Sequence, residues 1–338
     1  MTGVTGAGAW PGTDPLEAAT TVVGDLADAP SEVDGLPFAP LLPARGPWGD
    51  RTGAAVALLA DLPAELGPHG WKLAGRPGGD LARARSLARE DLDALAVAAH
   101  GYEGPLVLPV LGPHSLAAEV WLAHGDRVVS DPGALRDVLA SLAAGVAERV
   151  GDVRRVVPGA AVRVLVHEPL LAAVLAGAVP TFSGRDRLRR VPGQVAAEGL
   201  SALADAVRGA GAEAVVVHGG TAWSALATVR ASSADGAALA VAGLGERGWE
   251  EVALLVEDGR AFWPEPPPAA TSQCAGPDVL AQADAVTRPW RTVGLPVAGL
   301  RDVVLVAALP DAATPDDARG ALAGLVRAAG AVAERAEA

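Results

Sequence analysis

The stretch Val162-Arg-Val-Leu-Val166, followed at once by His167-Glu168-Pro169, has the pattern that decides the fold. It is a short apolar run that ends abruptly at polar residues. A run that is apolar at nearly every position is typical of a parallel strand covered on both faces. Two further stretches repeat the pattern: Leu106 to Leu111 leads into Gly112-Pro113-His114, and Ala214 to Val217 leads into His218-Gly219-Gly220. We therefore predict three buried strands, each followed by a histidine.

Strands and helices alternate along the rest of the chain. Further apolar runs predict strands at Gly3 to Ala9, Ala237 to Val241, Ala261 to Trp263 and Thr292 to Leu295, with a weaker one within Ala54 to Leu62. Between the runs, apolar residues recur at helical spacing in the stripes Leu81 to Leu95, Leu135 to Val146, Leu200 to Val207 and Ala318 to Val332. About eight strands that alternate with helices predict an α/β fold, a single (β/α)8 TIM barrel domain over residues 1–338. An open doubly wound sheet is the alternative.

The composition excludes several classes of protein. With 338 residues, 50% of them hydrophobic and 20% charged, and a mean hydropathy of +0.29, the chain can bury a large core. The net charge of −13 repels a phosphate backbone, so we expect no nucleic-acid partner. The triplet Gly6-Ala7-Gly8 lacks the third glycine of a dinucleotide fingerprint, and Lys72 lies outside any phosphate-loop motif. The sequence therefore does not support a nucleotide cofactor.

Cysteine usage and hydropathy bear on location. The only cysteine, Cys274, excludes an intramolecular disulfide and a cysteine-rich zinc site, and it fits a reducing compartment. No basic cluster with an apolar run follows Met1, and no apolar stretch of about 18 residues occurs. We expect a cytoplasmic protein that has a small-molecule ligand and no membrane partner.

The residues that follow the strands are the candidates for chemistry, because active sites of such barrels lie at the C-terminal ends of the strands. His114, His167 and His218 each follow a predicted strand, and Glu168 lies beside the second. If these side chains gather at the mouth of the barrel, the end at which its strands terminate, they would bind a metal or act as an acid and a base. The alternative is that each histidine is structural and hydrogen-bonds to nearby backbone. The sequence leaves both interpretations open.

Five short segments occur in the order and spacing of a known superfamily. They are Thr5-Gly-Ala-Gly-Ala-Trp-Pro-Gly-Thr-Asp14, Leu111-Gly-Pro-His-Ser-Leu116, His167-Glu-Pro-Leu-Leu171 with Ala173-Val-Leu-Ala-Gly177, His218, and Pro296-Val-Ala-Gly-Leu300. Through them nearly the whole chain resembles the catalytic domain of cobalamin-independent methionine synthases, in their short actinobacterial form, within the uroporphyrinogen decarboxylase-like barrels. The resemblance implies a barrel with Gly8, Gly112, Glu168, His218 and Gly299 around one end.

The resemblance also implies an activity: transfer of a methyl group from a folate-type donor to the thiol of homocysteine, which zinc holds deprotonated. Of the family's zinc ligands, the chain retains only the histidine, as His218. The two cysteine positions are Gly220 and Ala298, and the acidic position is Ala242 or an immediate neighbour. Neither Gly220 nor Ala298 offers a ligating side chain. The resemblance therefore predicts the fold without the usual zinc-dependent reaction.

The positions that hold the amino-acid substrate in the family differ as well. The resemblance assigns substrate binding to Gly8, Ala9 and Trp10 at the end of the first strand, and to Glu168. Ala9 replaces a serine of the family, and His167 replaces the aspartate that would meet an ammonium group. Three hypotheses follow. The chain is a non-zinc relative, inactive or with another substrate; or an active methyltransferase with a different metal held by the histidines; or an enzyme of another class in which His167, Glu168 and His114 carry acid–base catalysis.

Overall fold

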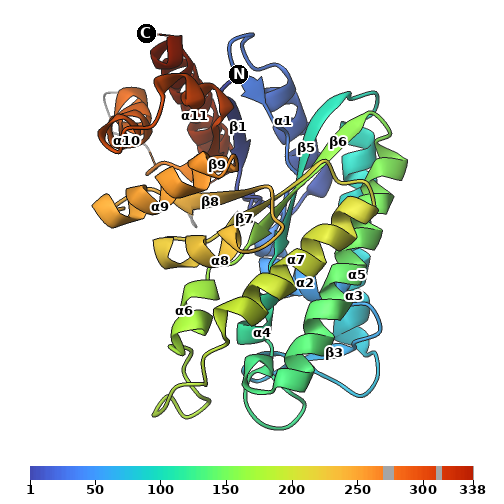
Figure 1. Cartoon of the computed structure of the whole chain (residues 1–338). Coiled ribbons are helices and arrows are strands. Elements are labelled where there is room, and N and C mark those ends of the chain that lie inside the picture. Colours follow the sequence, from blue (N-terminus) through green and yellow to red (C-terminus); the bar gives the residue numbers. More distant parts are fainter. Residues whose placement is uncertain (269–277, 310–313, 338) are drawn as a thin grey trace.

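The computed structural model describes residues 1–268, 278–309 and 314–337 of the chain (Figure 1). Cys274 lies outside these ranges. Within them, no helix has the length and apolar character that a membrane span requires.

Within the described ranges, eight parallel strands form the core of the fold. They are β1 (Gly3–Gly6), β2 (Asp34–Gly35), β5 (Gly104–Leu111), β6 (Ala160–His167), β7 (Ala214–His218), β8 (Gly236–Ala240), β9 (Ala261–Glu265) and β10 (Val304–Ala307). Hydrogen bonds join them into two sheets, in the orders β10-β1-β2 and β5-β6-β7-β8-β9. A separate antiparallel hairpin consists of β3 (Ala64–Gly67) and β4 (Gly70–Leu73).

The segment after β2 connects the two sheets. The Val107 N–H donates to the Pro37 carbonyl at 2.7 Å, and the Ala39 N–H donates to the Val107 carbonyl at 2.9 Å. At the opposite edges, β9 and β10 contact each other, although they belong to different hydrogen-bonded sheets. The strands thus follow one another in the order of a barrel, and the predicted α/β fold of the (β/α)8 type is confirmed.

Helices cover the outside of the strands (Figure 1). They are α1 (Pro15–Ala27), α2 (Arg51–Leu58), α3 (Gly79–Ala98), α4 (Pro113–Glu119), α5 (Pro132–Val156), α6 (Leu171–Ala176), α7 (Gly193–Gly209), α8 (Leu226–Arg230), α9 (Glu246–Glu257), α10 (Val279–Thr292) and α11 (Pro315–Glu337), with 3₁₀ turns η1 (Pro43–Arg45), η2 (Val128–Ser130), η3 (Trp223–Ala225) and η4 (Val297–Asp302). The four apolar stripes predicted as helices lie in α3, α5, α7 and α11, so these helices are confirmed.

Local sequence explains where several helices begin. Asp14 and Asp131 are the N-caps of α1 and α5, and each side chain accepts two backbone N–H bonds. Such a cap satisfies donors that the first turn of a helix leaves free. Proline follows each cap, where its missing N–H is tolerated. Each Asp-Pro pair therefore marks the point at which a loop ends and a helix begins.

Two of the predicted strands are wrong. Residues 54–58 of the weak run Ala54 to Leu62 lie in α2, which begins after Asp50, whose side chain accepts the N–H of Gly53 at 2.7 Å. The second barrel strand is instead the short β2. In the run Thr292 to Leu295, Thr292 is the last residue of α10, and the chain turns at Gly294. The φ of +82° at Gly294 is incompatible with a strand. The last barrel strand is β10, ten residues further along.

Close packing of α2 against α5 generates a stability prediction. A Cβ on Gly145 of α5 would lie 1.6 Å from the carbonyl oxygen of Leu58, so alanine there must displace backbone. We expect Gly145→Ala to lower the free energy of unfolding by about 2 kcal/mol or more. Gly151→Ala in the same helix is the matched control, because a Cβ there meets nothing within 4 Å. Because alanine has a higher helix propensity than glycine, Gly151→Ala should raise the free energy of unfolding by up to about 1 kcal/mol. Urea unfolding measures both, and equal stability of the two variants would contradict the packing.

Candidate functional site

His167 and His218 lie side by side at the C-terminal ends of neighbouring strands. They are the last residues of β6 and β7 and are partners in the register of the two strands. Because parallel neighbours in register point to the same side of a sheet, their rings meet, with centroids 5.2 Å apart and planes inclined by 34°. Both side chains are buried, with residue exposures of 3% and 5%. The pair forms the centre of the mouth.

Both ring nitrogens of His218 already have partners. The N–H of Gly220 donates to Nδ1 at 3.1 Å, and Nε2 lies 2.9 Å from Oε2 of Glu265, at the end of β9. A nitrogen that accepts a hydrogen bond carries no proton, so the proton of the neutral ring is on Nε2 and is donated to Glu265. His218 is thus held in one tautomer and offers no free lone pair.

His167 differs from its neighbour, because its Nε2 is buried and has no hydrogen-bond partner. Burial lowers the pKa of His167 well below its usual value, and the nearby positive charge of Arg51 acts in the same direction. A hydrogen bond to the backbone of Ala7 opposes this shift. His167 is therefore neutral near pH 7.

Arg51 brings a partly buried cation to the same end of the barrel. It is the first residue of α2, and its Nη2 donates to the Ala7 carbonyl at 3.2 Å. Burial lowers its pKa, while the charges of Glu119 and Glu265 raise it. Glu119, at the end of α4, is hydrogen-bonded to the hydroxyl of Thr52, and burial raises the pKa of this carboxyl. Arg51 and Glu265 were not among the residues that the sequence singled out.

Glu168 and His114 belong to a second, separate group. The carboxylate of Glu168 accepts the backbone N–H groups of His114 at 2.9 Å and Ser115 at 2.7 Å, and the hydroxyl of Ser115 at 2.7 Å. Its Oε1 also lies 3.2 Å from Nδ1 of His114. A carboxylate at the first turn of a helix satisfies free N–H groups and opposes the positive end of the dipole. Glu168 thus caps α4 from the neighbouring strand.

The ring of His114 points toward the helices around the barrel. A Cβ on Gly199 of α7 would lie 3.1 Å from its Cε1 and 2.5 Å from Leu139 of α5. The side chain is fully buried there. The structure therefore brings His167 and His218 together and holds His114 with Glu168 on the helical side. The catalytic roles of His114, His167 and Glu168 stay predictions.

Gly8, Ala9 and Trp10 follow β1 at the mouth. Gly8 has a φ of +102°, and a Cβ there would lie 2.6 Å from Pro109, so only glycine fits. Ala9 forms a parallel β-bridge with Leu41. The N–H of Leu41 donates to the Gly8 carbonyl, and the carbonyl of Leu41 accepts the N–H of Trp10. Trp10 is buried at 2% exposure, with its indole centroid 6.2 Å from that of Phe38. Its ring is part of the core, and a substrate-binding role for these three residues stays a prediction.

The positions assigned to the family's other zinc ligands are dispersed. Gly220 adjoins His218, whereas Ala242 is an exposed turn residue after β8. Ala298 and Gly299 lie in η4, which leads into the N-terminal end of β10. Because the strands are parallel, η4 is at the opposite end of the barrel from His218, and the expectation that Gly299 lies at the mouth is wrong. Over the described part of the chain, no three His, Cys, Asp or Glu side chains are grouped to hold a metal ion.

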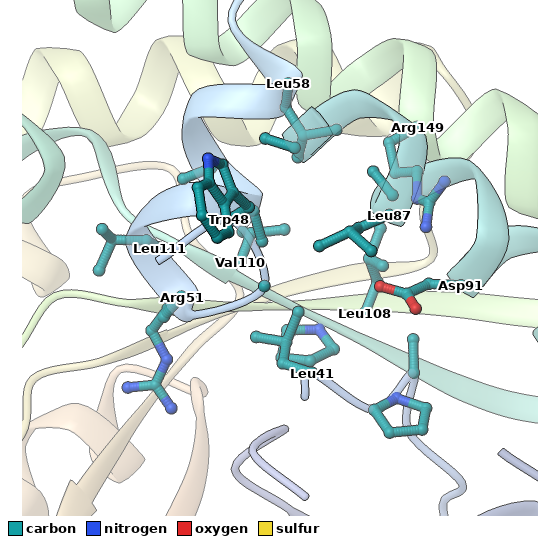
Figure 2. A pocket seen from close by; sticks show the side chains of 18 residues that line it. Leu41, Trp48, Arg51, Leu58, Leu87, Asp91, Leu108, Val110, Leu111 and Arg149 are labelled. Atoms are coloured by element: carbon teal, nitrogen blue, oxygen red, sulfur yellow. The ribbon is translucent and has the colours of Figure 1, made fainter. Parts of the chain in front are cut away.

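A small cavity adjoins the mouth between α2, α3 and β5 (Figure 2). Apolar side chains such as Leu58, Leu87 and Leu108 line it, Asp91 and Arg149 lie at one side, and Arg51 points away from it in Figure 2. Its volume of about 50 Å³ admits a few waters at most. The cavity is therefore a packing void rather than a substrate pocket.

Comparison with known proteins supports the architecture. No protein-family model and no curated protein matches the sequence. Among solved structures, the chain is similar to a B12-independent methionine synthase from Shewanella sp. W3-18-1 in complex with selenomethionine, with a TM-score of 0.56 and 12% sequence identity. The match covers 98% of this chain and 96% of the other. At this identity the likeness shows a shared fold.

The capping role of Glu168 can be tested by removing its charge. We expect Glu168→Gln to lower the free energy of unfolding by about 2–4 kcal/mol. Both carboxylate oxygens of Glu168 accept hydrogen bonds, whereas the NH2 group of glutamine cannot accept and would lie against a donor. Glu250→Gln, at an exposed position of α9, is the control and should change stability by less than about 0.5 kcal/mol. Chemical denaturation measures both. A Glu168→Gln protein as stable as the control would contradict the cap.

The buried neutral state of His167 predicts a pH dependence. Its pKa is lowered in the folded chain, so below about pH 6.5 the unfolded chain binds the proton first. The free energy of unfolding should fall as pH drops from 7 to 5.5, with this residue contributing up to about 1.4 kcal/mol per pH unit. His167→Asn keeps a donor for Ala7 and should flatten that slope. His69→Gln, at an exposed position, should leave it unchanged. Equal slopes in all three proteins would contradict the assignment.

Proposed function

We propose that this chain is a methionine synthase-like barrel that has lost zinc-dependent methyl transfer to homocysteine and binds a different small molecule at its mouth. The observation that carries the proposal is the state of His218, the only family ligand that the sequence retains. Its Nδ1 accepts the N–H of Gly220, and its Nε2 is bonded to Glu265. In this state the one lone pair of the ring already accepts a hydrogen bond and is not free for a metal.

The residues around His218 do not fit a zinc ion either. Structural and catalytic zinc sites in proteins use three or four ligands within about 2.3 Å of the metal. Gly220 has no side chain, and its φ of +68° together with the contact of a Cβ with Pro169 at 3.3 Å disfavours a cysteine there. Ala242 and Ala298 have no donor atoms and lie elsewhere. We therefore derive no step of a reaction through zinc or a folate-type methyl donor.

The free Nε2 of His167 supports a second candidate, an enzyme in which this imidazole is a general base. A neutral histidine with an available lone pair at a barrel mouth has the protonation state that a base needs at pH 7. In this proposal Glu168 and His114 have a structural role, since their contacts are with α4 and the surrounding helices. Residues 1–338 act as one barrel domain, because the first and last strands pair directly.

Metal content and turnover test the loss of zinc chemistry. Untagged protein, stripped with a chelator and then incubated with one equivalent of zinc, should retain well below one zinc per chain after gel filtration. It should also methylate no homocysteine from methyltetrahydrofolate above the rate without protein. Elemental analysis and a thiol assay measure the two properties.

Variants at Gly220 sharpen this test. Gly220→Cys should not restore zinc binding, because His218 stays engaged and the other positions lack donors. Gly220→Ala introduces the same backbone strain without a thiol, so both variants should lose about 1 kcal/mol of stability. Stoichiometric tetrahedral zinc or clear turnover by the unchanged protein would overturn the proposal.

A further inference from the structure

Three aromatic side chains form an exposed cluster away from the centre of the mouth. Phe182, on the segment after α6, lies nearly perpendicular to two other rings, with centroids 5.0 Å from His69 and 5.7 Å from Trp121. His69 is at the turn of the β3–β4 hairpin, and Trp121 follows α4, at the same end of the molecule (Figure 1). The N–H of Phe182 donates to Asp126 at 2.8 Å, which holds its segment in place. Phe182 is nevertheless 61% exposed, and aromatic side chains gathered in water are typical of an interaction surface.

Basic side chains share the face of this cluster. Single β-bridges join Lys72 to Trp121 and Trp121 to Arg127, and bridged residues of neighbouring strands point to the same side. The guanidinium of Arg127 accordingly stacks on the indole of Trp121, 4.7 Å from the ring centroid. Lys72 is paired with Glu65 at 2.9 Å, whereas Arg127 has no carboxylate within 4 Å in the described part of the chain. The face therefore combines aromatic rings with a cation that has no ion pair.

The segment that carries Phe182 adds four arginines to this face. It folds back on itself through a β-bridge between Pro180 and Arg187, and the N–H of Thr181 donates to the Asp186 carbonyl at 3.0 Å. The arginines of this turn and of the residues that follow it are all exposed: Arg185, Arg187, Arg189 and Arg190. Among the residues that the structure describes, none of the four has a carboxylate within 4 Å. Their donors are therefore free for an anionic partner.

The local charge is opposite to that of the whole protein. Residues 64–76, 120–128 and 179–190 contain seven Lys and Arg against three Asp and Glu, whereas the chain has a net charge of −13. The three acidic side chains already have partners, since Glu65 is paired with Lys72 and the other two, Asp126 and Asp186, accept backbone N–H groups. A concentration of unpaired cations on so acidic a protein favours an acidic partner.

A groove adjoins the aromatic cluster and gives a partner room to enter. It lies between β4 and the residues Ala123 and His124, has a volume of about 480 Å³, and is lined in part by Lys72 and Arg76. This volume is within the range of about 300–1,000 Å³ that is usual for binding pockets. We call the whole surface the arginine–aromatic patch; it consists of His69, Lys72, Arg76, Trp121, His124, Arg127, Phe182, Arg185, Arg187, Arg189 and Arg190.

We propose that the arginine–aromatic patch docks an acidic peptide segment of a partner protein, whose carboxylates pair with the arginines after Phe182 and whose apolar side chain packs on Phe182. A guanidinium binds a carboxylate through two parallel hydrogen bonds, which suits the unpaired arginines of the turn. A nucleic acid or an anionic membrane fits less well. Either would extend beyond the patch and meet the acidic remainder of the surface, which repels it.

Fluorescence anisotropy with a labelled peptide tests the patch. The probe is a synthetic peptide of alternating glutamate and serine with one central phenylalanine, capped at both ends. The unchanged protein should bind it at low ionic strength, and raising the salt to about 0.5 M should weaken binding roughly tenfold or more, because exposed charges are then screened. The same peptide with lysine in place of glutamate should not bind.

Variants separate the patch from the general charge of the protein. Arg185→Gln combined with Arg187→Gln should weaken the probe roughly fivefold or more. Arg247→Gln combined with Arg327→Gln removes the same charge at exposed positions of α9 and α11, and this control should bind as the unchanged protein does. Phe182→Ser should weaken the probe but leave unchanged the affinity for a peptide in which serine replaces the phenylalanine.

Two further ligands and one further measurement complete the test. Oligothymidylate of the same charge as the probe, and vesicles of anionic lipid, should bind more weakly than the peptide. Hydrogen exchange of the unchanged protein, which needs no variant, should show that the peptide protects residues 180–190 and leaves α9 as it was. Tighter binding of either competing ligand, equal losses in the two double variants, no binding of the probe at low salt, or no protection of residues 180–190 would overturn the inference.

Discussion

The two hydrogen bonds of His218 determine the arrangement of the mouth. By accepting from Gly220 and donating to Glu265, the ring is fixed in position and tautomer. Its fixed face provides the surface against which His167 packs, with 5.2 Å between centroids. Because Glu265 is used by His218, its charge does not contact Arg51, and the guanidinium remains without an ion pair. One structural histidine thus leaves its neighbour, His167, with the free nitrogen.

The pleat of β6 explains why adjacent residues have different surroundings. Successive side chains of a strand point to opposite faces, so His167 turns into the mouth and Glu168, the next residue, turns toward α4. The cap that Glu168 forms requires close approach, since a Cβ on Gly112 would lie 2.4 Å from its carboxyl carbon. Polar groups on both sides are buried. The carboxylate of Glu168 is fully hydrogen-bonded on the helical side, whereas Nε2 of His114 on that side and Nε2 of His167 in the mouth have no partner.

The sequence predicted the interior of the fold better than its ends and its site. Long apolar runs such as Leu106 to Leu111 identified strands, because burial on both faces leaves a simple pattern. The prediction from sequence missed β2, which is only two residues long. It also assigned a strand to part of α2, because the apolar residues of that helix follow one another as they do in a buried strand. The rule that gave His167 and His218 would also have found Glu265, which follows an apolar run. Arg51 could not be found this way, because it does not follow a predicted strand and its role depends on contacts across the barrel.

The likeness to a methionine synthase structure at 12% identity concerns the fold, and the site has to be argued from its own residues. A barrel core tolerates many apolar exchanges if volume and pattern are kept, so the fold persists while the sequence changes. A metal centre requires every ligand, because each missing donor leaves the remaining ones free to find other partners. In this chain His218, the position that the resemblance assigns to a zinc ligand, is hydrogen-bonded to Gly220 and Glu265. A metal would have to displace one of these two bonds before it could bind a nitrogen of His218.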